Sequence, residues 1–421
     1  MKILETFHHP EKYWKIFLKW SLLGAIIGTI GGILGAVFHH VLHFVTHLRG
    51  EHPWLILLLP LGGLATVALY RLLRLRKNRG TNEIIDAILD GESVNPLVAP
   101  GIFLATTMTH LLGGSAGREG AALQLGGSMA SLLSQGLRLK ENERTVMIMA
   151  GMSAVFAGLF GTPLTATFFC MEFESVGMIF SPALLPCYLA AFTASRVSAA
   201  LGVHAEIFPL NDTVAFTFTV NWQVLILAFL VGLLGIGMCW TFHQAEHFAA
   251  KRIPNVWLRI ALGGALITVL TLLVGDHRYN GAGMDMALKA VGGQADWYDF
   301  AMKLIFTAVT LAAGFKGGEI VPTFCIGATF GWLTGSLLGL DPGFAAALGL
   351  VGLFCSVTNS PFASIMLSIE MFGGTNVTLF AFVCVITFVL SGNWGLYASQ
   401  RIQFSKSRMV KRQQDRIRNH E

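Results

Sequence analysis

The sequence predicts an all-α polytopic membrane protein whose two halves repeat each other in opposite orientation. Three observations predict this class: a shortage of charge, long apolar runs and an internal repeat. Of 421 residues only 13% are charged and 54% are hydrophobic, with a mean hydropathy of +0.62, whereas soluble chains carry about 25% charged residues. A helix crosses a bilayer with about 20 apolar residues. We expect membrane helices within the runs 16–45, 54–73, 224–242, 260–274 and 379–391.

The basic residues predict how the chain lies in the membrane. Residues 1–17 are polar and lack a short apolar core followed by small residues, so a secretory signal peptide fits poorly. The net charge of +5 lies mainly in loops and in the tail, at 71–79, 138–144, 251–259 and 401–418, and basic loops stay in the cytoplasm. We therefore expect a bacterial inner-membrane protein with both termini in the cytoplasm. Its basic residues would contact lipid headgroups, and we expect no nucleic-acid partner.

The cysteines and the short motifs give no sign of a reaction centre. All six cysteines lie in apolar segments without paired spacing, which is typical of small buried side chains rather than disulfides or metal ligands. They are Cys170, Cys187, Cys239, Cys325, Cys355 and Cys384. Because the sequence contains no HExxH or Walker motif, we expect no enzyme activity, no metal site and no cofactor. A membrane-embedded enzyme is the third hypothesis, after the two transport functions named below.

Two pairs of segments align at an offset of about 200 residues, which indicates an internal repeat. FAGLFGTPLTATFFCMEFES (156–175) aligns with FCSVTNSPFASIMLSIEMFG (354–373), and GREGAALQLGGS (117–128) aligns with GEIVPTFCIGAT (318–329). The matched positions are Pro163 with Pro361, Glu172 with Glu370, Gly117 with Gly318 and Gly126 with Gly327.

We expect five parts in the chain. They are an N-terminal cytoplasmic segment (1–15), a first membrane repeat (16–203), a connector (204–220), a second membrane repeat (221–405) and a basic tail (406–421).

The charges that flank the first helix of each half predict opposite orientations. Lys12, Lys15 and Lys19 precede the first helix of the first half, and the following loop, 47–54, has no excess of lysine or arginine. In the second half the order is reversed, because an uncharged start is followed by the basic loop 251–259. By the positive-inside rule the halves enter the membrane from opposite sides. Inverted repeats are typical of transporters, with the site near the midplane.

Three glycine-rich segments predict helices that break inside the membrane, at 80–88, 117–127 and 317–327. A half-helix that starts at the midplane presents free N–H groups and a positive dipole end to a cavity, which makes an anion site. Alternatively, the glycines only permit close packing of helices. That alternative does not explain Glu119 and Glu319, each of which stands inside one of these segments.

The motifs GREGA, GGEIVP, the two proline-initiated helices and the tyrosine of NWGLY (393–397) resemble the CLC anion channels and exchangers. The resemblance covers nearly the whole membrane chain. It implies the homodimeric CLC fold, in which two inverted repeats bring broken helices together at the midplane and each subunit has its own pore.

The resemblance also implies the site. Glu119 would be the gate: its carboxylate occupies the anion site, competes with the incoming anion and leaves when protonated. The alternative for Glu119 is a salt bridge with Arg118, itself a pore-mouth or structural residue. Tyr397 would cap the inner side of the site, or alternatively anchor the chain at the interface. The implied anion-binding residues are Gly80, Thr81, Asn82, Gly117, Arg118, Gly120, Gly318, Ile320, Val321 and Tyr397.

Four positions depart from the common chloride pattern and resemble the fluoride-exporting branch of the family. Ala121 follows GREG in place of proline, Thr81 replaces a serine, Phe173 stands where chloride/proton exchangers carry an inner glutamate, and Glu319 adds a carboxyl. Fluoride is strongly hydrated, and a protonated carboxyl is a strong donor that could replace its water. The resemblance implies a fluoride/proton antiporter in which Glu319 hands the ion or the proton onward. The alternative is a chloride/proton antiporter or passive chloride channel of the same fold.

Two further groups of residues have a structural and a functional interpretation. Glu172 and Glu370 end their helices near an interface and are predicted to be structural, with a transport role as the alternative. A histidine cluster lies on the first long helix, where we expect an interfacial cluster at its outer end. A pH sensor or a metal site is the alternative for this cluster, which consists of His39, His40, His43 and His47.

Overall fold

The computed structural model describes residues 10–75, 79–208, 210, 217–402 and 406, and these residues are mainly helical. The first repeat contains α2 (Pro10–Glu51), α3 (Leu59–Leu72), α4 (Thr81–Asp90), α5 (Val98–Leu111), α6 (Glu119–Gly136), α7 (Glu141–Phe160), α8 (Pro163–Glu172) and α9 (Leu184–Ala200). The second contains α10 (Phe218–Arg252), α11 (Val256–Val274), α12 (Met284–Val291), α13 (Asp299–Ala313), α14 (Ile320–Leu338), α15 (Pro342–Thr358), α16 (Pro361–Phe372) and α17 (Val377–Leu390). Short 3-10 turns cover Pro53–Leu58 and Ser181–Ala183, and two short strands, β1 (Ser175–Val176) and β2 (Arg401–Ile402), pair in parallel.

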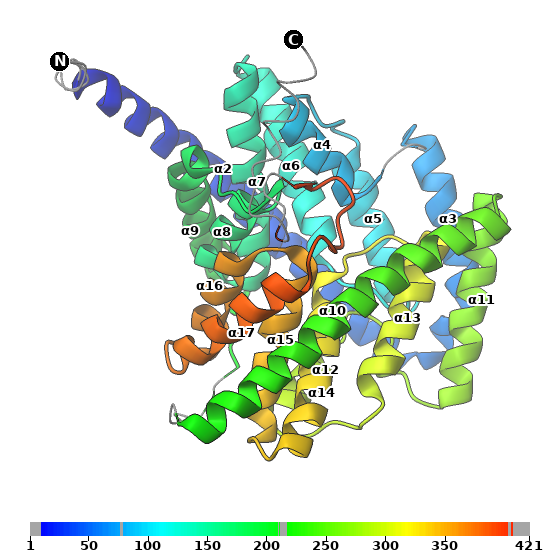
Figure 1. Ribbon diagram of the computed structural model, residues 1–421. Helices are drawn as coiled ribbons and strands as arrows, with labels where there is room; N and C mark the ends of the chain where they lie inside the picture. Colours follow the sequence, from blue (N-terminus) through cyan, green and yellow to red (C-terminus); the bar gives the residue numbers. More distant parts are fainter. Residues whose placement is uncertain (1–9, 76–78, 209, 211–216, 403–405, 407–421) are drawn as a thin grey trace, which may run out of the picture.

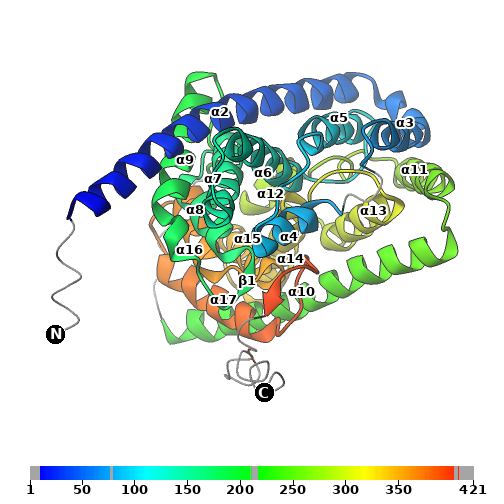
Figure 2. The same cartoon turned by 90° about the horizontal axis from the view of Figure 1, so that it is seen from above.

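The two halves use the same packing scheme. In the first, the long helix α2 packs on α7 and α9; in the second, the long helix α10 packs on α15 and α17. Figure 2 shows α2 and α10 along opposite sides of the molecule, with the shorter helices between them. The proline-initiated helices α8 and α16 pack on each other (Figure 1). The predicted all-α architecture of two repeats is confirmed.

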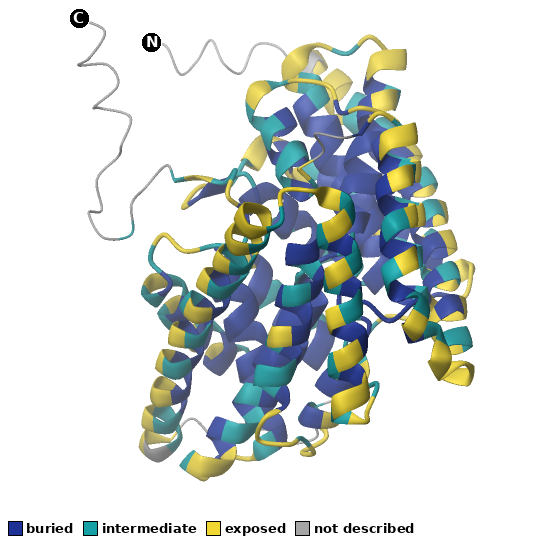
Figure 3. Ribbon diagram, turned by 90° about the vertical axis from the view of Figure 1, so that its right-hand side faces the viewer, coloured by how far each residue is buried: buried dark blue, intermediate teal, exposed yellow. Residues whose placement is uncertain are grey.

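Helix length and exposure agree with a bilayer environment. Seven stretches of the described residues are long and apolar enough to cross a membrane, and they include the predicted runs 16–45, 224–242 and 260–274. The outward faces of the outer helices are exposed, whereas the central helices are buried (Figure 3). The run 379–391 was wrongly predicted to span the membrane, because α17 has only 14 residues and is too short to cross alone.

Some glycines serve close packing, as the alternative interpretation proposed. Gly126 of α6 faces the backbone of Gly151 in α7, and a methyl group on it would overlap the carbonyl oxygen. Gly327 of α14 faces Gly349 of α15 in the same way in the second repeat. The glycines at the C-terminal ends of the two aligned segments therefore allow close helix contact, while those at the N-terminal ends form the crossing described below.

Glu172 and Glu370 each cap the start of a helix in the other repeat. The Glu172 carboxylate accepts hydrogen bonds of 3.2 and 2.8 Å from two backbone N–H groups in the first turn of α16. The Glu370 carboxylate accepts two bonds of 2.8 Å from the first turn of α8, and a third of 2.6 Å from the Thr165 hydroxyl. These bonds satisfy free N–H groups at two helix starts. They give both glutamates the structural role that was predicted.

Candidate functional site

The centre of the molecule is a crossing of the two glycine segments. The Gly117 N–H donates to the Gly318 carbonyl at 2.7 Å, and the Gly318 N–H donates to the Gly117 carbonyl at 2.8 Å. Helices α6 and α14 begin directly after these residues. A methyl group on Gly318 would lie 2.6 Å from the Gly120 nitrogen, so the crossing has no room for a side chain there. Two helix N-termini, one from each repeat, therefore meet at one point.

Glu119 is the first residue of α6 and is 0% exposed. Its Oε2 accepts a 3.1 Å hydrogen bond from the backbone N–H of Val321, in the first turn of α14. Its Oε1 is buried and has no hydrogen-bond partner among the described residues. A carboxylate from one repeat thus occupies the positive helix end of the other.

Arg118 does not pair with Glu119, so the salt-bridge alternative is wrong. Its Nη2 donates to Glu206 Oε1 at 2.7 Å, and its guanidinium lies 5.0 Å from the centre of the Phe160 ring. Its Nη1 lies 3.3 Å from His39 Nδ1. Neighbouring residues at a helix start point in different directions, which separates the two charged side chains.

A cavity of about 760 Å³, here called the α4 cavity, reaches the crossing from the side of α4 and the C-terminal segment. Five buried polar atoms among the residues that line it have no hydrogen-bond partner in the described part of the chain: Tyr70 Oη, Gln124 Oε1, Arg259 Nε, Glu319 Oε2 and Tyr397 Oη. Thr81 also lines it, and a methyl group on Gly120 would lie 3.1 Å from the Thr81 hydroxyl. Strong hydrogen-bonding groups without partners are therefore concentrated beside the crossing.

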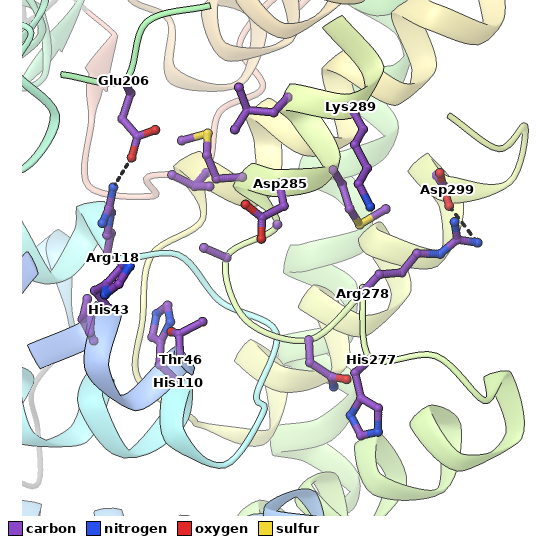
Figure 4. Close-up of a pocket in the computed structure, with 18 of the residues that line it drawn as sticks. His43, Thr46, His110, Arg118, Glu206, His277, Arg278, Asp285, Lys289 and Asp299 are labelled. Atoms are coloured by element: carbon purple, nitrogen blue, oxygen red, sulfur yellow. Dashed lines mark hydrogen bonds and ion pairs between the residues drawn. The ribbon is translucent and has the colours of Figure 1, made fainter. Parts of the chain in front are cut away.

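A second cavity of about 860 Å³, here called the α12 cavity, includes Arg118 and Val321 in its lining. Figure 4 shows side chains from the first repeat, among them His43 and His110, facing Asp285 and Lys289 of α12 across this cavity. His39 and His47 also line it, whereas the ring of His40 bonds the Leu201 carbonyl at 2.8 Å. No group of three His, Cys, Asp or Glu side chains within the described ranges is arranged to hold a metal ion.

The residues singled out from the sequence divide into three groups. Arg118 and Val321 line the α12 cavity, while Glu119, Gly117, Gly120, Gly318 and Ile320 lie at the crossing. The group that lines the α4 cavity consists of Gly80, Thr81, Asn82, Glu319 and Tyr397. Asn82 has a structural contact there, because its Oδ1 accepts a 3.0 Å bond from the Ser399 N–H and ties α4 to the C-terminal segment.

Aromatic rings approach the site from α8, α14 and α15 rather than from α4. The Phe173 ring, which stands where an inner glutamate was expected in chloride/proton exchangers, lies 4.9 Å from the Tyr397 ring. Phe169 lies 5.1 Å from Phe173, and Phe354 lies 5.6 Å from Phe169 and 5.3 Å from Phe324 of α14. A continuous row of rings therefore connects Tyr397 with α14.

A buried lysine and a half-buried lysine near the crossing were missed from the sequence. Lys303 of α13 is 0% exposed, and its ammonium donates to Ser115 Oγ at 3.0 Å and to the carbonyls of Tyr279 and Gly281 at 3.1 and 2.7 Å. Lys316, between α13 and α14, lines the α4 cavity. The signal was present, because an ionisable residue within an apolar membrane stretch is a functional candidate by default.

The molecule has two inverted repeats, and their broken helices meet between two cavities. This arrangement defines a membrane transporter or channel of the inverted-repeat class. The chain belongs to the CLC family, because the family model described as voltage gated chloride channel matches residues 62–392.

Individual relatives agree with this assignment. The chain is 36% identical over 365 residues to a protein of Pseudomonas syringae pv. tomato named chloride/fluoride channel protein, covering 85% of this chain and 81% of the relative. The crystal structure of a CLC-type fluoride/proton antiporter matches with a TM-score of 0.89 at 34% identity, over 91% of this chain and 98% of that one. The structure of a slow cyanobacterial Cl−/H+ antiporter, at 20% identity and a TM-score of 0.76 over 88% of this chain and 94% of that one, shares the fold.

Proposed function

We propose that this protein is a fluoride/proton antiporter that exports fluoride across the bacterial inner membrane with the energy of the proton gradient. The observation that carries the proposal is the Glu119 carboxylate on the Val321 N–H, at the point where the two repeats cross. The named relatives at 36% and 34% identity support fluoride as the anion.

The bond between Glu119 and Val321 suggests how anion and proton are coupled. An anion that reaches the crossing needs the same N–H group that the carboxylate occupies, so the two exclude each other. Protonation removes the negative charge of Glu119 and weakens its hold on the helix end. The protonated carboxyl then becomes a donor, which strongly hydrated fluoride needs when it loses water. Release of the proton returns the carboxylate to its own site.

Glu319 is proposed as the second proton-coupling residue. Its Oε2 lacks a partner in the described part of the chain and borders the α4 cavity, together with the Tyr397 hydroxyl and Thr81. Phe173, whose apolar ring lies beside Tyr397, stands where chloride/proton exchangers carry a further glutamate. We therefore place the inner step of the proton route at Glu319 and the α4 cavity.

The distribution of basic residues gives the orientation of the proposed exporter. Arg71, Arg79 and Arg259 line the α4 cavity and belong to the basic loops 71–79 and 251–259. Basic loops remain in the cytoplasm, so the α4 cavity is the entrance for internal fluoride and the α12 cavity is the exit. Both termini are then cytoplasmic. The family resemblance further supports a homodimer with one pore per subunit, and repeats over 16–203 and 221–405.

A chloride/proton antiporter or passive chloride channel is the second candidate, because the matching family is named for chloride channels. Purified protein in liposomes separates the candidates, with a fluoride electrode, a chloride electrode and a pH electrode read together. Fluoride efflux with matching proton uptake and little chloride efflux is the expected result. Chloride efflux equal to or faster than fluoride efflux would mean that Thr81 and Glu319 do not select fluoride.

A further inference from the structure

Lys316 and Tyr70 are two polar side chains of the α4 cavity whose N–H and O–H groups donate no hydrogen bond to another described residue. The Lys316 ammonium lies 4.7 Å from the centre of the Tyr70 ring and makes no hydrogen bond or ion pair with any other described residue. Tyr70 is 7% exposed, and its buried hydroxyl has no hydrogen-bond partner in the same part of the chain. Buried polar groups are normally paired. The carboxylates of Glu246 and Glu319 line the same cavity and attract the Lys316 ammonium, but neither forms a hydrogen bond or an ion pair with it. An anion between the ammonium and the Tyr70 hydroxyl would satisfy both.

The charges of the two cavities differ in a way that favours an anion at Lys316. The α4 cavity is lined by more cations than carboxylates, namely Arg71, Arg79, Arg259 and Lys316 against Glu246 and Glu319. In the α12 cavity the numbers are equal, with Arg49, Arg118, Arg278 and Lys289 against Glu206, Asp285, Asp296 and Asp299. Two of those cations are directly paired, Arg118 with Glu206 at 2.7 Å and Arg278 with Asp296 at 2.7 Å. In the α4 cavity one cation, Arg79, is paired, with Asp86. An excess of positive charge in a low-dielectric cavity concentrates anions and speeds their arrival.

Lys316 is also well placed to deliver an anion to the crossing. Only Gly317 and Gly318 separate it from Glu319, and Gly318 is itself bonded to Gly117. The ring of Tyr70 covers one side of the ammonium, a contact that stabilises the cation without using its N–H donors.

We propose that Lys316 and Tyr70 form an anion-capture site in the α4 cavity, which binds fluoride before it reaches the crossing at Glu119. The identity of the anion and the direction of transport rest on the proposed function; the site itself rests on the unpaired ammonium and hydroxyl. Lys316 supplies charge and hydrogen-bond donors, and Tyr70 supplies one further donor.

Membrane vesicles that keep the cellular orientation test the site, because the loaded anion then enters from the α4 cavity. Initial efflux is measured over a series of internal fluoride concentrations. For Lys316→Gln we expect the KM for internal fluoride to rise about tenfold, and for Tyr70→Phe about threefold, with Vmax retained. Lys316→Arg keeps the charge and should restore a KM close to that of the unaltered protein. The dependence of efflux on ionic strength should become weaker in Lys316→Gln.

Lys289→Gln is the matched control, because it removes a lysine from the α12 cavity and should leave the internal KM unchanged. An unchanged KM in Lys316→Gln would overturn the proposal. A loss of Vmax without a KM change, not rescued by Lys316→Arg, would also overturn it by showing a structural lysine. The same series is run with chloride. If the unaltered protein moves only chloride, the proposed function fails, while the chloride KM of Lys316→Gln still decides whether the capture site exists.

Discussion

The two oxygens of Glu119 have different surroundings, and this difference defines its proposed role. One oxygen is held by the N–H group of Val321, and the other is buried without a partner among the described residues. A purely structural carboxylate would have both oxygens satisfied, as Glu370 does at the start of α8. The half-satisfied state of Glu119 is suited to a side chain that alternates between two positions and two charge states.

Glu119→Gln should abolish proton movement during fluoride efflux, because an amide has the shape of the acid but does not exchange a proton near neutral pH. The measurement is the external pH during efflux from liposomes. Glu92→Gln, an exposed glutamate in a loop, is the control and should keep full coupling. Proton uptake at the normal rate in Glu119→Gln would remove Glu119 from the gate.

Glu319→Gln should slow fluoride efflux about tenfold or more. The substitution removes one hydrogen bond to a charged group, and the free energy of such a bond corresponds to a factor of about ten. Chloride efflux, if any, should change less, because chloride is less dependent on strong donors. Parallel electrode traces measure both rates. Fluoride efflux unaffected by the substitution would make Glu319 a structural residue.

At the scale of elements, the crossing depends on the absence of side chains. Gly318→Ala places a methyl group 2.6 Å from the Gly120 nitrogen, and overpacking of this kind costs about 1–3 kcal/mol. We expect a lower melting temperature and a loss of transport. Gly237→Ala in α10 is the control, since nothing lies within 4 Å of the added methyl group, and alanine is the better helix former. Normal transport by Gly318→Ala would show that the crossing tolerates a wider spacing.

The reciprocal caps make a separate prediction. Glu172→Ala leaves free N–H groups at the start of α16 and should lower the free energy of unfolding by about 1–2 kcal/mol, measured as thermal unfolding in detergent. The ratio of protons to fluoride should stay unchanged, because Glu172 is bonded at an element junction rather than at the crossing. A changed ratio with normal stability would instead give Glu172 the transport role that was the alternative.

The element scale also shows what the sequence predicts well and what it does not. The aligned prolines correctly placed the starts of α8 and α16, and the glycine segments correctly predicted that α6 and α14 begin there. The bond between Gly117 and Gly318 was not predicted. The ion pair of Arg118 with Glu206 could not be predicted, and neither could the capping of α8 by Glu370 and of α16 by Glu172. Each of these contacts joins residues far apart in the chain. The contact of Lys316 with the Tyr70 ring also joins residues far apart in the chain, so the sequence gives no sign of it.

At the scale of the whole molecule, the two inverted repeats produce two unlike cavities from one architecture. The α4 cavity carries an excess of cations, and the α12 cavity carries balanced charges and the histidines of α2. In the proposed orientation, anions are collected on the cytoplasmic side and are not concentrated at the exit. This asymmetry suits an exporter, although both directions pass through the same crossing.

Uphill proton movement driven by fluoride tests the central claim most directly. Liposomes containing the protein are loaded with potassium fluoride at an internal pH below the external pH, and valinomycin allows potassium to balance the charge. The account predicts that fluoride efflux draws protons inward against their gradient, and that Glu119→Gln does not do so. Fluoride efflux while protons move only down their own gradient would contradict antiport and leave a passive anion channel.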